Sequence, residues 1–312
     1  MDGQSLTREL ADILREDPDT SGFIRLQASY DWLYQAAIEI TRRTQCLTSS
    51  QTITTVGDQR GYTLDADFLW LYLKNHRNEY FIKYNDGTND YFLTWRDYDA
   101  IVAGNQTTSV DIPSKFCIID YSMLTSPITG TATDTGTLSN SESTLTDSTA
   151  PFANISVGDE VHNTTSDSDG IVLAVTSTSA LLTALFSATS SVDYWATSDA
   201  YVIVPQGRKQ LYLDPPPLTA GHTITVQFIQ KPTPVYSPYR TYRFDNLAKG
   251  VLVKYAAWLY KYRDREPNFG DGFYRYFEME CARAVKQSGR TFNRSSFKVN
   301  FMKRSFRDRS YR

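Results

Sequence analysis

Apolar positions recur at helical spacing in two segments near the start of the chain. In residues 5–15 the leucines and an isoleucine stand three or four positions apart, and in residues 29–43 aromatic and aliphatic side chains follow the same rule. This spacing places apolar side chains on one face of a helix. The pattern therefore predicts two N-terminal helices, the first of which ends near Pro18.

From Gln51 onward the apolar period changes to two, which is typical of strands. The short alternating runs are residues 52–54, 61–64, 68–73, 80–84 and 90–94. Asn85-Asp86-Gly87 has the composition of a hairpin turn between two of them. A further strand is expected at residues 116–123, with residues 209–213 as its returning partner. These runs predict a small antiparallel sheet.

The segment between that last pair of strands differs in composition from the rest of the chain. Residues 126–205 contain no Lys or Arg and are dominated by Ser and Thr, yet apolar side chains recur within them. Strands are expected at residues 160–162, 170–175 and 200–204. A break in composition between paired strands indicates a domain inserted into a loop. We predict a small all-β module here; the alternative is a disordered Ser/Thr-rich linker.

Helical spacing returns after an extended, proline-bearing stretch at residues 231–242. Asp245 is expected to cap one helix, and a last helix is expected at residues 273–285. Residues 264–272 should form the turn between them. The predicted fold class is α+β: a helical bundle of N-terminal helices and a C-terminal helical hairpin, a small antiparallel sheet, an inserted all-β module and an extended C-terminal arm.

The arm, residues 289–312, is basic and aromatic. Eight basic side chains stand against the single acid Asp308. The basic residues are Arg290, Arg294, Lys298, Lys303, Arg304, Arg307, Arg309 and Arg312, and the rings are Phe292, Phe297, Phe301, Phe306 and Tyr311. We expect the arm to become ordered on a partner, since it has no clear period of its own. Residues 1–125 and 206–288 would then form the core unit that carries both the insert and the arm.

Overall composition limits the classes of function. The 312 residues are 41% hydrophobic and 13% aromatic, which predicts a folded protein, and a net charge of −3 gives no overall attraction to nucleic acid or to anionic membranes. Cys46, Cys117 and Cys281 are too far apart for a CxxC pair, so neither a disulfide framework nor a zinc site is expected. No apolar run approaches membrane-spanning length. We expect a protein of a reducing compartment without membrane contact.

Histidines and carboxylates are the remaining candidates for catalysis. The three histidines, His76, His162 and His222, lie far apart and outside metal-binding spacings, so we expect them to be ordinary side chains. No GxSxG motif supplies a nucleophile. Two suitably spaced acids are enough for glycoside hydrolysis, and the candidate acids are Glu39, Glu266 and Glu278. We nevertheless predict a protein that is no enzyme and that holds no cofactor and no metal.

Several short motifs follow one another in order on either side of the insert. They lie at residues 30–41, 52–56, 62–68, 211–217, 232–236 and 264–271. Together they resemble the head-to-tail adaptors of short-tailed bacteriophages, also described as head-completion or tail accessory proteins. The resemblance covers most of residues 20–125 and 206–289. Where the family typically has Leu-Pro before an acidic residue, this chain has Leu64-Asp65-Ala66.

The resemblance implies a structural virion protein at the head-tail junction, assembled in the host cytoplasm. Such adaptors form a ring below the portal, dodecameric like the portal itself. The implied partners are the portal protein, a tail nozzle or tail tube protein, other copies of the chain, and transiently the genomic DNA in the channel. The portal would bind the arm residues Arg290, Phe292, Arg294, Phe297, Lys298, Phe301, Lys303, Arg304, Phe306, Arg307, Arg309 and Tyr311. The alternatives are a virion-associated peptidoglycan hydrolase and a DNA-binding module that uses the arm.

Overall fold

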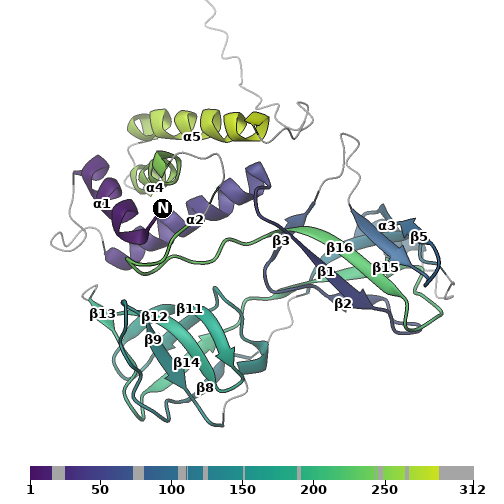
Figure 1. Ribbon diagram of the computed structural model, residues 1–312, viewed down its shortest axis with the longest axis horizontal. Helices are drawn as coiled ribbons and strands as arrows, with labels where there is room; N and C mark the ends of the chain where they lie inside the picture. Colours follow the sequence, from purple (N-terminus) through teal and green to yellow (C-terminus); the bar gives the residue numbers. More distant parts are fainter. Residues whose placement is uncertain are drawn as a thin grey trace, which may run out of the picture.

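The computed structural model describes residues 1–15, 25–72, 81–104, 110, 112–121, 126–149, 152–187, 191–242, 244, 249–263 and 267–287. These residues form a group of helices, a β-sandwich and the inserted β module (Figure 1). Three clusters of buried apolar side chains stabilise them, one for each part. The helical cluster also includes side chains of the inserted module.

Four helices form the first part. They are α1 (Gly3–Leu14), α2 (Leu26–Thr44), α4 (Lys249–Arg263) and α5 (Pro267–Gln287). The two N-terminal helices predicted from the apolar spacing are confirmed, and Asp2 caps α1 by accepting a 2.7 Å hydrogen bond from the Ser5 amide. Helix α4 contacts α1, α2 and α5, so it is the central helix. Its predicted cap, Asp245, lies outside the described residues.

Two sheets pack face to face in the sandwich. The five-stranded sheet contains β1 (Thr48–Thr54), β16 (Thr223–Gln230), β4 (Ile82–Asn85) and β5 (Asp90–Phe92), with β3 (Phe68–Leu71) also paired to β16. The four-stranded sheet contains β2 (Gly61–Thr63), β15 (Arg208–Asp214), β7 (Lys115–Tyr121) and β6 (Thr94–Trp95). All pairs are antiparallel except β6 with β7. The short helix α3 (Tyr98–Gly104) contacts β7.

The pairing expected across the insert is confirmed. Strands β7 and β15 are antiparallel neighbours, from Lys115 opposite Asp214 to Tyr121 opposite Arg208. The predicted hairpin turn also lies between β4 and β5, where Gly87 has a φ of +93° that a side chain would disfavour. Because β7 and β15 pair directly, the whole segment between them leaves the sandwich and returns to it at one place.

That segment is the inserted module, and its described residues form strands and one 3₁₀ turn. The strands are β8 (Ile128–Thr131), β9 (Ser143–Thr146), β10 (Glu160–Asn163), β11 (Ser168–Ser177), β12 (Ala180–Ser187), β13 (Val192–Asp193) and β14 (Ala200–Val204). They make a seven-stranded sheet around a core that includes Phe152, Leu181, Trp195 and Tyr201. The all-β content expected of this segment is confirmed, and the disordered-linker alternative is wrong for these residues.

The module also packs against the helices. Ile171, Leu173, Ala184 and Phe186 on β11 and β12 are buried in the helical cluster. On the same junction, Arg240 binds both oxygens of Glu142 at 2.5 and 3.1 Å. The module therefore shares part of its apolar surface with the helices.

The predicted fold class is wrong in its proportions. The structure has 37% strand and 29% helix, in three multi-stranded sheets, and is not a helical bundle with one small sheet. The difference comes from pairing between distant segments. Strand β16 is the centre of the five-stranded sheet and pairs with β1, β3 and β4, which all come from the first third of the chain. Local alternation predicted strands in these places, but it does not indicate which strands pair or how large each sheet becomes.

The turn predicted at residues 264–272 is also longer than the observed break. Helix α5 begins at Pro267, so Phe269-Gly270-Asp271-Gly272 is helical. Proline is well suited to the first turn of a helix, because its missing N–H has no partner there. Gly270 faces α4 closely: a Cβ at this position would lie 3.1 Å from Cδ1 of Trp258. The glycine thus serves helix packing instead of a turn.

Candidate functional site

The residues predicted to bind a portal all lie outside the described residues, as do His76 and Glu266. This holds for the whole set from Arg290 to Tyr311. The structure therefore places the other sequence candidates, and it brings together two groups of polar side chains. One group joins α2 to α5, and the other lines a cleft between α2 and the inserted module.

Two of the candidate acids share one arginine between α2 and α5. The Arg43 guanidinium binds Glu39 at 2.6 Å and Glu278 at 3.3 Å, and it donates to the Tyr274 hydroxyl at 2.9 Å. Burial lowers the Arg43 pKa, but the hydrogen bonds to Glu39 and Tyr274 outweigh it and raise this pKa above its usual value. The guanidinium also lies 5.1 Å from the ring centroid of Phe277. This arrangement links α2 to α5 through one guanidinium.

A cleft of about 680 Å³ lies between α2 and the inserted module. One wall is a face of α2, formed by residues that recur three or four positions apart. It consists of Gln27, Asp31, Tyr34, Gln35 and Ile38. The opposite wall comes from β10, β11, β14 and the segments beside them, and consists of Gly158, Glu160, Val161, His162, Asp169, Gly170, Ile171, Val202, Val204 and Gln206. Tyr236, from the extended stretch before α4, completes the lining.

Asp31 lies on α2 and faces Tyr236 across the cleft lining. The Tyr236 hydroxyl donates a 2.6 Å hydrogen bond to Asp31 Oδ1. Burial raises the pKa of Asp31, the hydrogen bond lowers it, and the charges of Glu160 and Asp169 raise it further, so the net shift is upward. The folded protein therefore disfavours the ionised form of Asp31 more than the unfolded chain does.

Asp31→Asn is accordingly expected to stabilise the protein at neutral pH. Below the unfolded-state pKa of about 3.9, Asp31 is protonated in both states and costs the wild type no stability. Because its folded-state pKa is raised, the free energy of unfolding falls as pH rises through that folded-state pKa. The variant avoids that loss. Urea unfolding should show a gain near pH 7 and about none near pH 3. The exposed Asp134→Asn is the control, and a gain that persisted at about pH 3 would contradict the charge explanation.

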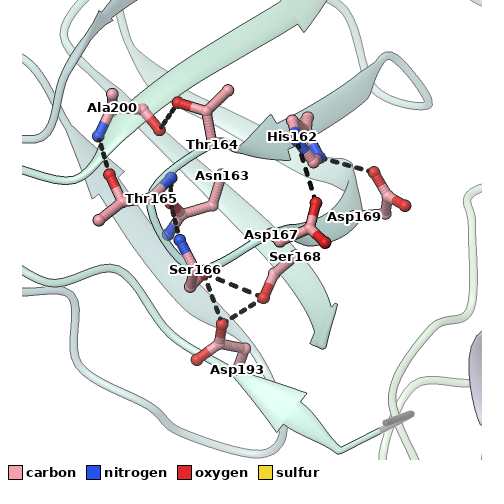
Figure 2. A network of polar contacts seen from close by, with 10 residues as sticks. All are labelled: His162, Asn163, Thr164, Thr165, Ser166, Asp167, Ser168, Asp169, Asp193 and Ala200. Atoms are coloured by element: carbon pink, nitrogen blue, oxygen red, sulfur yellow. Dashed lines mark hydrogen bonds and ion pairs between the residues drawn. The ribbon is translucent and has the colours of Figure 1, made fainter. Parts of the chain in front are cut away.

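A network of polar contacts surrounds the turn between β10 and β11, beside the cleft residues His162 and Asp169 (Figure 2). His162 presents both ring nitrogens to carboxylates, with Nδ1 2.8 Å from Asp169 and Nε2 3.8 Å from Asp167. On the other side of the turn, the hydroxyls of Ser166 and Ser168 both donate to Asp193. These contacts hold His162 and Asp169 at the cleft, whereas His222 lies in the sandwich, 2.7 Å from the Tyr84 hydroxyl.

The cysteines lie apart from the cleft. All three are free thiols, with Cys117 and Cys281 buried. Burial raises the pKa of Cys117 to about 11 and that of Cys281 to about 12, so both are protonated near neutral pH. These two thiols are therefore poor nucleophiles where the structure places them.

Sequence reasoning missed the residues that line the cleft. Asp31, Tyr34 and Tyr236 were identified only as parts of motifs, and Glu160 only as part of a strand. One signal was available: Asp31, Gln35 and Ile38 form a mixed polar and apolar face of α2 beside its apolar one. A face of this kind indicates that α2 contacts a second, more polar surface in addition to the helical core.

The described residues contain no group of three His, Cys, Asp or Glu side chains able to hold a metal ion. None of the described helices is long and apolar enough to cross a membrane. In comparisons with known proteins, no family model matches this chain, and none of the curated proteins matches it.

Proposed function

We propose that this chain is a head-to-tail adaptor of a short-tailed bacteriophage, a structural protein that forms a ring under the portal and joins head to tail. The observation that carries the proposal concerns the two segments that resemble adaptors. Although the insert separates them in sequence, they fold together: β1 pairs with β16, β2 pairs with β15, and α2 packs on α4. They form one continuous unit.

Individual motifs of the resemblance also meet in space. Tyr62 of one motif lies opposite Leu211 of another in neighbouring strands. The rings of Tyr30 and Tyr236, from two further motifs, have centroids 5.8 Å apart. Motifs that are distant in sequence but in contact have a shared structural role. This supports reading them as one family pattern instead of unrelated short matches.

Ring assembly needs two different interfaces on each subunit, because a closed ring joins unlike surfaces. Large apolar side chains are exposed on both parts of the unit. On the sandwich, Trp70 is 46% exposed and Phe92 51%. On α5, Met279 is 58% exposed. Exposed rings and Met are enriched in protein interfaces, so these two regions are candidates for contacts between neighbouring subunits.

The arm is the proposed anchor on the portal. Its phenylalanines would be buried in clefts of the portal ring, and its arginines would pair with portal acids or face the DNA in the channel. A chain that ends at Ser288 should fold normally but bind the portal ring about a hundredfold more weakly, which corresponds to about 2.7 kcal/mol. Sedimentation of the chain with purified portal rings measures this loss.

A matched variant separates the two contributions of the arm. Serine at Phe292, Phe297, Phe301 and Phe306 leaves every basic side chain in place, so it should lose most of the affinity if ring burial provides it. Equal binding by the shortened and the full chain would show that the arm is not the anchor. Salt-sensitive binding of duplex DNA without any portal binding would instead favour the DNA-binding alternative.

A further inference from the structure

The cleft between α2 and the inserted module exists only because the module docks on the helix. Its volume of about 680 Å³ is within the range of ligand pockets, about 300–1,000 Å³. Its walls come from a helix of the core unit and from strands of the insert. The inserted module can therefore give the core unit a binding site that the core unit would not have alone.

The charge of the lining limits the kind of ligand. Asp31, Glu160 and Asp169 contribute carboxylates, and no Lys or Arg is among the residues that line the cleft. A phosphate, a sulfate or a nucleic acid would be repelled by these carboxylates, and the basic side chain of the lining, His162, already lies against Asp169 and Asp167. The ligand is therefore neutral or cationic.

The hydrogen-bonding groups of the cleft favour a neutral ligand over a cationic one. Asp31 binds Tyr236 through Oδ1, which leaves Oδ2 as an acceptor without a described partner. The Tyr34 hydroxyl and the Gln35 amide likewise make no hydrogen bond with another described residue. An arginine or lysine side chain only donates, whereas a hydroxyl group both donates and accepts, so a hydroxyl group can pair with the Asp31 acceptor and also with the Gln35 donors.

Apolar surface is also available beside these groups. Gly158 lets the Tyr34 hydroxyl approach the backbone closely, because a Cβ at that glycine would lie 3.2 Å from the hydroxyl oxygen. Ile38, Val202 and Val204 supply apolar walls. The cleft thus offers donors, acceptors and apolar surface together, which a ring that carries several hydroxyl groups would satisfy.

We propose that this cleft binds a neutral saccharide, with Asp31, Tyr34 and Glu160 as hydrogen-bonding partners of its hydroxyl groups. The site is independent of the adaptor proposal, because it needs only the observed docking of the module on α2. Binding should depend little on salt, because a neutral saccharide forms no ion pair with the protein that salt could screen.

Isothermal titration calorimetry on the full chain tests the site with three probes: maltotetraose, cellotetraose and tetra-N-acetylchitotetraose. We expect at least one probe to bind, equally well at about 0.1 M and about 0.5 M NaCl. Tyr34→Phe and Glu160→Gln should each weaken binding by about tenfold, because the first removes a hydroxyl group and the second replaces an acceptor oxygen by an amide donor, while both keep the shape of the side chain. The control is Tyr194→Phe, which changes a tyrosine that is 48% exposed on the same module and outside the cleft lining.

Three outcomes would overturn the proposal. The first is that none of the three probes binds. The second is that both Tyr34→Phe and Glu160→Gln bind as the wild type does, which would place the saccharide elsewhere. The third is that hexa-arginine binds at low salt, is released at high salt and excludes every saccharide, which would make the cleft a site for cationic peptides. Circular dichroism on each variant confirms that folding is unchanged.

Discussion

Replacing Phe186 with alanine is expected to cost about 3–5 kcal/mol and to destabilise the helices together with the inserted module. Phe186 lies on β12 of the module but is only 1% exposed and belongs to the helical core. Its ring centroid lies 6.0 Å from that of Tyr30 on α2 and 6.4 Å from that of Tyr236. Removing the ring opens a cavity at the junction, which neither side can fill alone. Urea unfolding monitored by circular dichroism measures the loss.

Phe152→Ala is the matched control, because it removes the same side chain from the module's own core. Phe152 is fully buried and its ring lies 6.0 Å from that of Tyr201, within the module. It should destabilise the module by about as much, about 3–5 kcal/mol, but should leave a separate helical transition. If Phe186→Ala also left the helical transition unchanged, the module would be an independent body and the prediction would be wrong.

Local patterns predicted many elements of this fold, but not α3 or the module strands β8, β9, β12 and β13. The helical spacing before residue 44 predicted α1 and α2, and the alternation in the insert predicted β10, β11 and β14. Both signals depend on side chains a few residues apart, so the sequence carries them directly. The direct pairing of β7 and β15 was also predictable, since the change in composition marks where the chain leaves and returns.

The proportions of the fold were not predictable in the same way. Strand β16 is short, yet it is the centre of a five-stranded sheet. Nothing within its eight residues indicates three partners from the first third of the chain. The sequence therefore favoured too large a share of helix. The spacing that marks a helix lies within one segment, whereas the strands of a sheet come from distant segments.

The cleft was beyond sequence reasoning for a related reason. Asp31, Glu160 and Tyr236 come from a helix, a strand of the insert and an extended stretch before α4. Their meeting depends on how the module docks, which is decided by packed apolar residues such as Phe186 and not by the polar residues themselves. Each of the three has an ordinary local role in its own segment.

A pair of similar turns organises the module itself. Before β10, Asp159 accepts a 2.8 Å hydrogen bond from the Ser156 amide, and before β14, Asp199 accepts one of 2.8 Å from the Ala196 amide. The residue before each aspartate has a positive φ, +94° at Gly158 and +73° at Ser198. Because β10 and β14 are antiparallel neighbours, Asp199 also binds Asn163 at the end of β10, and Asp159 also binds the Gln206 amide just beyond the end of β14. Two short polar turns thus hold both ends of one strand pair.

Asp199→Ala is expected to cost about 4 kcal/mol, because it leaves two donors without a partner at about 1–3 kcal/mol each. Asp199 is 7% exposed, and its Oδ2 accepts from both the Ala196 amide and the side-chain amide of Asn163, each at 2.8 Å. Asn163 in turn orders the β10–β11 turn that carries His162 and Asp169, so the module's wall of the cleft should loosen as well (Figure 2). Thermal unfolding and proteolysis of the module measure the two effects.

Asp199→Asn provides the decisive comparison, because the amide oxygen can occupy the position of Oδ2 and accept both hydrogen bonds. We expect it to cost less than about 1 kcal/mol, since neither buried donor loses its partner. If asparagine destabilised the module as much as alanine does, the negative charge and not the two hydrogen bonds would hold this turn. The same comparison at Asp159 should then show whether both turns work alike, because Asp159 also accepts from the Gln206 amide at 3.0 Å, where the chain returns to the sandwich.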